Sequence, residues 1–149
     1  MTHEDKNNLV SMVINVAVNG YIIWRLTQMN DAGAFDGPDA LTNWARMVIW
    51  VIPISIVLMI IGTILFNILF AVATNDAKPS FVSDERDKLF GNRSMVAVVI
   101  FAGAGFISSI ICLAIGWSAL FAFNVIYFSF ALGSFAGDIT KFISYRRGY

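Results

Sequence analysis

The sequence predicts an all-α integral membrane protein, a four-helix bundle made of two antiparallel transmembrane hairpins. Composition is the first reason. The chain has 149 residues, of which 58% are hydrophobic and only 13% are charged, whereas soluble domains carry about 25% charged residues. Charge distribution is the second reason, because residues 7–24, 47–75 and 94–137 contain no Asp, Glu, Lys or Arg. The last of these ranges suffices for two crossings of about 20 residues each.

We expect a single transmembrane domain over residues 1–149, with helices at 8–26, 43–74, 94–115 and 118–142. The first should be an uncleaved helix, because the segment before it lacks the net positive charge of a secretory signal. The second would be roughly 48 Å long, which exceeds the hydrocarbon core of about 30 Å. Pro53 is therefore expected to kink it, and the remaining length to be tilt or projection from the bilayer.

A short turn is expected between the third and fourth helices, where Gly116 ends one and Ser118 caps the next. Small residues on these two helices would let their backbones approach closely. This packing occurs either within one chain or between two copies in a homodimer. The candidate packing positions are Gly103, Gly105, Gly133 and Gly137.

Orientation follows from the basic residues. Eight of the ten Lys and Arg residues fall in the N-terminal tail, the middle loop 75–93 and the C-terminal tail, and only Arg25 and Arg46 fall on the other side. Because cytoplasmic loops are enriched in Lys and Arg, both termini and the middle loop are expected in the cytoplasm.

Four asparagines are expected inside the membrane: Asn15, Asn19, Asn67 and Asn124. Asn15 and Asn19 are four residues apart and share one helix face. Such amides either form hydrogen bonds between helices, worth about 0.6–2 kcal/mol, or line a polar cavity or path. Asn124 is expected at the depth of Ser108 and Ser109 and is a candidate partner for them.

Asp138 is the acidic residue expected to feel the bilayer most strongly. It lies near the C-terminal end of the fourth helix, where the helix dipole disfavours an anion. A cationic partner is therefore expected, either Lys141 or one of Arg86 and Arg93. A structural ion pair and a role in ion or proton coupling are the alternatives.

The charged segment before the third helix and the basic tail form a candidate cytoplasmic binding surface. Ser83 is expected to cap a short helix whose first turn is acidic. The alternatives are a solvated connector for the segment and a lipid anchor for the tail. The candidate partner-binding residues are Asp84, Glu85, Arg86, Asp87, Lys88, Arg93, Arg146 and Arg147.

Two short motifs resemble those of an uncharacterised family of small four-helix bacterial inner-membrane proteins. One is the run Asp84-Glu-Arg-Asp-Lys-Leu89 with Arg93 after it, and the other is Tyr145-Arg-Arg-Gly148. The resemblance covers about residues 79–149 and implies a bacterial inner (cytoplasmic) membrane location. The run Phe90-Gly-Asn and Asp138 depart from the family's pattern. No catalytic residues are implied by it.

The sequence favours a non-enzymatic interaction or regulatory protein that presents its charged face to a cytoplasmic protein. The alternatives are a small oligomeric transporter or channel lined by the asparagines, and an accessory subunit of a larger membrane complex. An enzyme is not expected, because no nucleophile–base set or phosphate loop is visible. With one His and one Cys in the chain, no metal or cofactor is expected. The expected partners are membrane lipids, a second copy and a cytoplasmic protein, without direct nucleic-acid binding.

Overall fold

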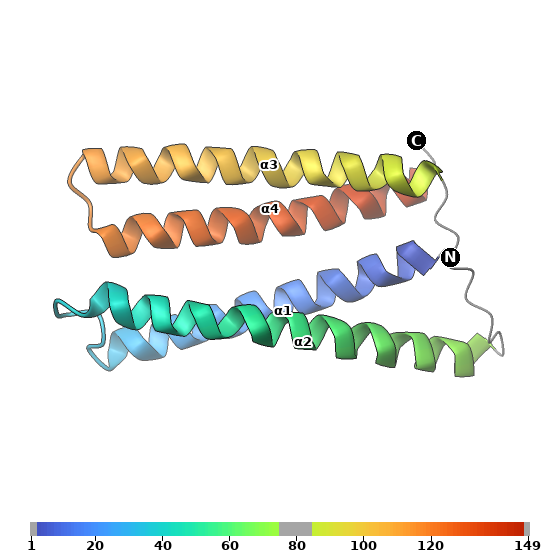
Figure 1. The fold of residues 1–149 in the computed structure, drawn as a ribbon, viewed down its shortest axis with the longest axis horizontal. Coiled ribbons are helices and arrows are strands. Elements are labelled where there is room, and N and C mark those ends of the chain that lie inside the picture. The colour runs from blue at the N-terminus through green and yellow to red at the C-terminus, as the bar shows by residue number, and fades with distance from the viewer. Residues whose placement is uncertain (1–2, 75–84, 148–149) are drawn as a thin grey trace.

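The computed structural model describes residues 3–74 and 85–147, and nearly all of them are helical. The four helices are α1 (His3–Asp31), α2 (Ala40–Thr74), α3 (Glu85–Ala114) and α4 (Ala119–Arg147) (Figure 1). By length and composition, all four are long and apolar enough to cross a membrane. The prediction of an all-α chain with four such helices is therefore confirmed.

All four helices are longer than predicted, α2 by only three residues because it begins at Ala40. Helix α1 begins before residue 8 and continues to Asp31, and α4 continues past residue 142 to Arg147. Helix α3 begins at Glu85 rather than at residue 94, so the charged segment from Glu85 to Arg93 forms its first turns. The charge-free ranges located the apolar part of each helix and omitted the ends that carry charged residues. The expected cap Ser83 and its neighbour Asp84 lie outside the described residues.

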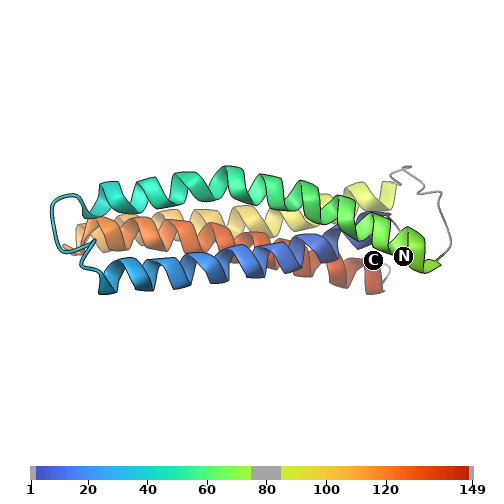
Figure 2. The ribbon, with the colours of Figure 1, turned by 90° about the horizontal axis from the view of Figure 1, so that it is seen from below.

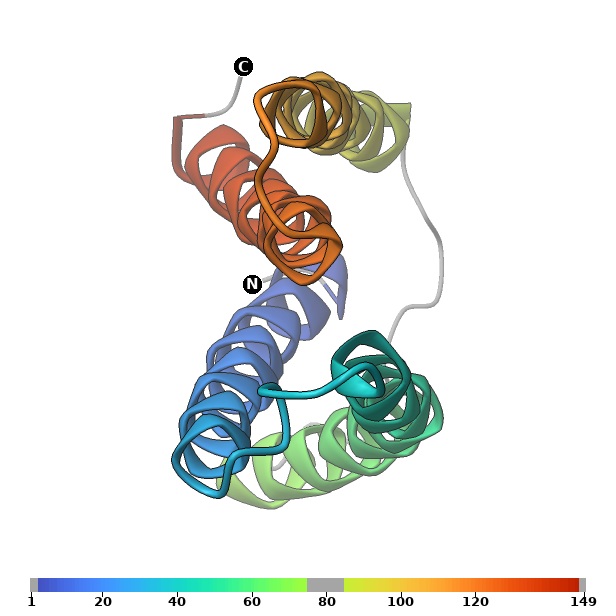
Figure 3. The ribbon, with the colours of Figure 1, turned by 90° about the vertical axis from the view of Figure 1, so that its left-hand side faces the viewer.

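The helices lie side by side in the order α3, α4, α1, α2 (Figure 3). Both short connections, residues 32–39 and 115–118, lie at one end of the molecule, which we call the turn end (Figure 1). The start of α1 and the end of α4 lie at the opposite end, which we call the terminal end. Helix α4 is therefore central, because it packs on α3 along one side and on α1 along the other.

Glycines bring α3 and α4 close together. Gly105, Gly133 and Gly137 are buried between them. A Cβ atom would lie only 3.2 Å from the backbone oxygen of Val98 if placed on Gly133, and 3.1 Å from that of Ser94 if placed on Gly137. Gly103, predicted to share this role, is exposed with no neighbour within 4 Å of such an atom.

The connection between α3 and α4 has the expected capping geometry. Gly116 adopts a positive φ of 87°, a conformation that favours glycine. Its N–H donates to the oxygen of Leu113, and the next N–H, of Trp117, donates to Cys112, which is the Schellman pattern of a helix end. The Ser118 hydroxyl then accepts the N–H of Phe121 at 3.2 Å. The predicted helix stop and N-cap are both confirmed.

Helix α2 is the least enclosed element. Among its described side chains only Trp44 and Val51 are buried. It contacts α1 at Gly62, where a Cβ atom would lie 2.7 Å from the Ile14 side chain and 3.3 Å from that of Val10. Pro53 lies inside the helix, and Figure 2 shows that α2 bends along its length, as a proline that lacks an N–H donor would cause.

Candidate functional site: a polar seam between α1 and α4

A row of polar side chains joins α1 to α4 inside the apolar part of the molecule. On α1 these residues recur every three or four positions, which places them on one helix face. On α4 they recur at intervals of seven and four, with the same consequence. We call this row the polar seam, and its members are Asn8, Ser11, Asn15, Asn19, Tyr127, Ser134 and Asp138.

At the end of the seam nearer the terminal end, α1 holds the Asp138 carboxylate. The Ser11 hydroxyl lies 3.1 Å from each carboxylate oxygen, and the Asn15 amide donates to Oδ2 at 3.2 Å. The Asn8 amide donates to the backbone oxygen of Asp138 at 2.9 Å. Lys141, one of the predicted cationic partners, lies three residues further along α4. The neutral partners on α1 were not predicted.

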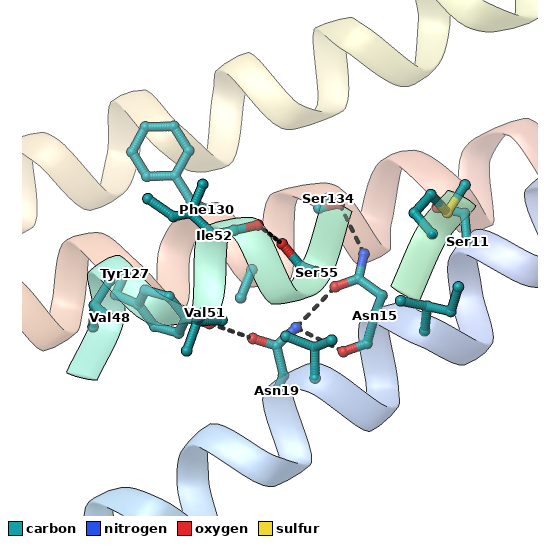
Figure 4. A pocket seen from close by; sticks show the side chains of 14 residues that line it. Ser11, Asn15, Asn19, Val48, Val51, Ile52, Ser55, Tyr127, Phe130 and Ser134 are labelled. Carbon is teal, nitrogen blue, oxygen red and sulfur yellow. Dashed lines mark hydrogen bonds between the residues drawn. The ribbon is translucent and has the colours of Figure 1, made fainter. Parts of the chain in front are cut away.

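The middle of the seam is a continuous chain of hydrogen bonds. The Asn15 amide also donates to the Ser134 hydroxyl at 2.8 Å, so both of its hydrogen bonds to α4 are donated to side chains. The Asn15 side-chain oxygen accepts from the Asn19 amide at 2.8 Å. Tyr127 closes the chain by donating from its hydroxyl to Asn19 Oδ1 at 3.1 Å (Figure 4). The seam therefore extends about 16 Å along α4, from Asp138 to Tyr127.

An open pocket of about 340 Å³ lies beside the seam, between α1, α2 and α4. Figure 4 shows Asn15, Asn19 and Ser134 at this pocket. Helix α2 contributes mainly apolar side chains, including Val51, together with the Ser55 hydroxyl, which donates to its own helix at 2.8 Å. The pocket combines a few convergent polar groups with an apolar wall, the usual composition of a small-molecule site.

Two predicted membrane asparagines lie away from this pocket. Asn124 accepts a hydrogen bond at 3.0 Å from the Trp44 indole, which joins α4 to α2. The suggested pairing with Ser109 is not made, because that buried hydroxyl donates within α3 to Phe106. Asn67 lies in the second half of α2, does not line the pocket and is partly exposed.

The predicted charged surface lies at the terminal end, where α3 begins and α4 ends (Figure 1). Asp87 is buried, unlike the other described residues of this predicted surface. It accepts a hydrogen bond from the Tyr145 hydroxyl at 2.5 Å. Phe90 is also buried and meets the Tyr145 ring edge-on, with 5.1 Å between centroids. The exposed members are Glu85, Arg86, Lys88, Arg93, Arg146 and Arg147.

Several seam residues were missed from the sequence, namely Asn8, Ser11, Tyr127 and Ser134. Their spacing was the available signal, since positions 8, 11, 15 and 19 and positions 127, 134 and 138 follow helical periods. A single polar residue in a membrane helix is uninformative by itself. Two polar rows of matching length predict a contact between their helices.

Chemically, the seam offers hydroxyl and amide groups and one carboxylate. Within residues 3–74 and 85–147, no three His, Cys, Asp or Glu side chains lie close enough together to hold a metal ion. Comparison of the chain with protein-family models, curated proteins and solved structures finds no match.

Proposed function

We propose that the chain is a multi-pass protein of the bacterial inner membrane, threaded as two antiparallel transmembrane hairpins. Helices α1 and α2 form one hairpin, and α3 and α4 form the other. Both termini and residues 75–93 lie in the cytoplasm, because the sequence ranges 1–7, 75–93 and 138–149 contain eight of the ten basic residues and cytoplasmic segments are enriched in Lys and Arg. The resemblance of the Asp84–Leu89 run and the Tyr145–Gly148 tail to small inner-membrane proteins supports the same assignment.

Its proposed role is non-enzymatic, namely to present a charged cytoplasmic surface to a protein partner. The buried hydrogen bond between Tyr145 and Asp87 carries this proposal. It fixes the start of α3 against the end of α4, so the exposed charges of the two helices form one surface of defined shape. A pre-organised surface loses less conformational entropy on binding than a flexible one, and complementary charge adds specificity.

Charge reversal tests this role. We would isolate native complexes from membranes with the wild-type chain and with the double variant Arg86→Glu, Arg93→Glu, and identify the bound proteins by mass spectrometry. A protein that co-purifies with the wild type and is lost from the double variant is the expected result. The matched control Arg25→Glu, Arg46→Glu makes the same charge change at the turn end and should retain it. Identical recovery in all three samples, or no protein at all, contradicts the role.

The pocket beside the seam favours a second function, a small transporter or channel. Asn15, Asn19 and Ser134 face a space that α2 closes with few contacts. The pocket is open on one side, so a second copy of the chain would have to complete a path. The test is proton and monovalent-cation flux in liposomes. Flux should fall with Asn15→Ala and Asn19→Ala and persist with Asn67→Ala, and equal flux in all variants removes this function.

A further inference from the structure

Two arginines at the turn end line one pocket between α1 and α2. Arg25 comes from α1 and Arg46 from α2, and the pocket has a volume of about 320 Å³. Each arginine is six residues from the connection, since α1 ends at Asp31 and α2 begins at Ala40. Both therefore lie about 9 Å below the ends of their helices, at a common depth.

This depth is close to the edge of the hydrocarbon core and about 2 Å inside it, from which a long arginine side chain reaches the headgroup layer. Helix α1 has 29 residues and is about 44 Å long, some 14 Å longer than the hydrocarbon core, so about 7 Å projects at each end if the helix is centred. The aromatic side chains Tyr21 and Trp50 line the same pocket and are exposed. Both lie about one helical turn deeper than the arginines, on the hydrocarbon side of the interface.

The charges of the two guanidinium groups are not compensated within this pocket. Arg25 donates to Gln28 at 3.2 Å, and within the described residues neither arginine forms an ion pair. The acidic residues of the turn end, Asp31, Asp36 and Asp39, do not line the pocket. Asn43 also lines the pocket, and its amide donates to the backbone oxygen of Ala34 at 3.0 Å. The two arginines together suit an anion, and guanidinium groups bind phosphate through paired N–H donors.

The remaining walls of the pocket are apolar and include Met47, Val51 and Ile54 of α2. Ile54 is exposed and lies two helical turns deeper than Arg46, so it would face acyl chains where the arginines face headgroups. A free phosphate ion has no apolar part that could contact these side chains. We propose that Arg25 and Arg46 form a site for the phosphate of an anionic phospholipid, whose acyl chain lies along α2.

The inference rests on the proposed membrane-spanning arrangement but not on the proposed cytoplasmic partner. It also gives a role to Arg25 and Arg46, the two basic residues that lie outside the segments predicted to be cytoplasmic. Retention of the chain in carbonate-washed membranes tests the spanning arrangement separately. Failure of that arrangement is thus distinguishable from failure of the lipid site.

Native mass spectrometry of the detergent-solubilised full chain tests the site, with phosphatidylglycerol and phosphatidylcholine as probes. We expect the wild type to bind its first phosphatidylglycerol at least tenfold more tightly than phosphatidylcholine. Removing both charges in Arg25→Gln, Arg46→Gln should weaken the binding of phosphatidylglycerol about 30-fold, since each basic residue near a membrane surface contributes about fivefold. The matched control Arg86→Gln, Arg93→Gln removes the same charge at exposed positions near the start of α3 and should keep this first binding event within threefold.

Two further measurements keep the proposal decidable. Arg25→Lys, Arg46→Lys retains the charge and loses the paired donors, so it should show an intermediate loss, less than tenfold. It also replaces the glutamine variant if circular dichroism shows that variant to be unfolded. Equal binding of the two lipids by the wild type, or loss of less than threefold in the folded glutamine variant, overturns the proposal. Displacement of phosphatidylglycerol by equimolar inorganic phosphate assigns the site to a soluble ligand instead and overturns the lipid assignment.

Discussion

Replacing Asn15 by alanine should weaken the attachment of α1 to α4. The Asn15 amide donates to Ser134 at 2.8 Å and to Asp138 at 3.2 Å, and both bonds cross between helices. Hydrogen bonds between membrane helices average about 0.6 kcal/mol each, which gives about 1.2 kcal/mol. The Asp138 carboxylate also loses one of its two donor side chains, and an under-satisfied acceptor adds about 1 kcal/mol. The expected loss in the free energy of unfolding is therefore about 2 kcal/mol.

The assay is reversible unfolding in mixed micelles, in which a denaturing detergent is titrated while helicity is followed by circular dichroism. A loss of about 2 kcal/mol lowers the ratio of folded to unfolded protein about 30-fold. Asn67→Ala is the matched control, because it removes the same amide from a membrane helix but outside the seam. It should reduce stability by less than about 0.5 kcal/mol. If the two variants lose equal stability, the reasoning is wrong.

A double-mutant cycle then isolates the single hydrogen bond. Asn15→Ala and Ser134→Ala, measured alone and together, should show a coupling free energy of about 0.6 kcal/mol, because residues in contact are not additive. Additive losses in the two variants would mean that the bond between these side chains contributes nothing to stability. The packing of α1 on α4 would then not depend on the hydrogen bonds of the seam.

Three further predictions concern α3 and α4. Tyr145→Phe leaves the buried Asp87 carboxylate without its 2.5 Å donor and should lower the free energy of unfolding by about 1–3 kcal/mol, measured in the same titration. Gly105→Ala places a methyl group against a side chain of α4 and should lower the free energy of unfolding by about 1–3 kcal/mol. Its control, Gly103→Ala, lies at an open position and should leave the free energy of unfolding unchanged or raise it. Gly116→Ala places a residue with a side chain at a φ of 87°, which costs about 1 kcal/mol of conformational strain, and it should therefore lower the thermal midpoint. An unchanged midpoint would contradict the strain.

Much of the fold was accessible from the sequence because a membrane imposes simple limits. Apolar length located the four helices, and the capping roles of Gly116 and Ser118 follow from local backbone chemistry. The helix ends were not predictable from hydropathy, because α3 continues through the charged residues from Glu85 onward. A helix leaves the hydrocarbon without a change in its backbone hydrogen bonds, so loss of apolar character does not end it.

The candidate site was only partly accessible. Asn15, Asn19 and Asp138 stand out as polar residues in apolar surroundings, but their partners depend on which helices touch. Helices that follow one another in the sequence are expected to pack together, but α1 and α4 are not consecutive, so their contact could not be predicted in this way. Asp87 illustrates the same difficulty, since its neighbours in sequence are charged and exposed while it is buried against Tyr145.

The contacts between helices differ in kind, and this difference separates the two candidate functions. Helices α3 and α4 approach closely at glycines, so their separation would open a dry, well-packed interface. Helices α1 and α4 are joined by directional polar bonds. Helix α2 is held by Val51, by the Trp44–Asn124 bond and by the contact at Gly62, and most of its apolar surface is exposed. It is therefore the element whose displacement breaks the fewest contacts. Any transport through the pocket would have to use that displacement, whereas the charged surface on α3 and α4 would be unaffected by it.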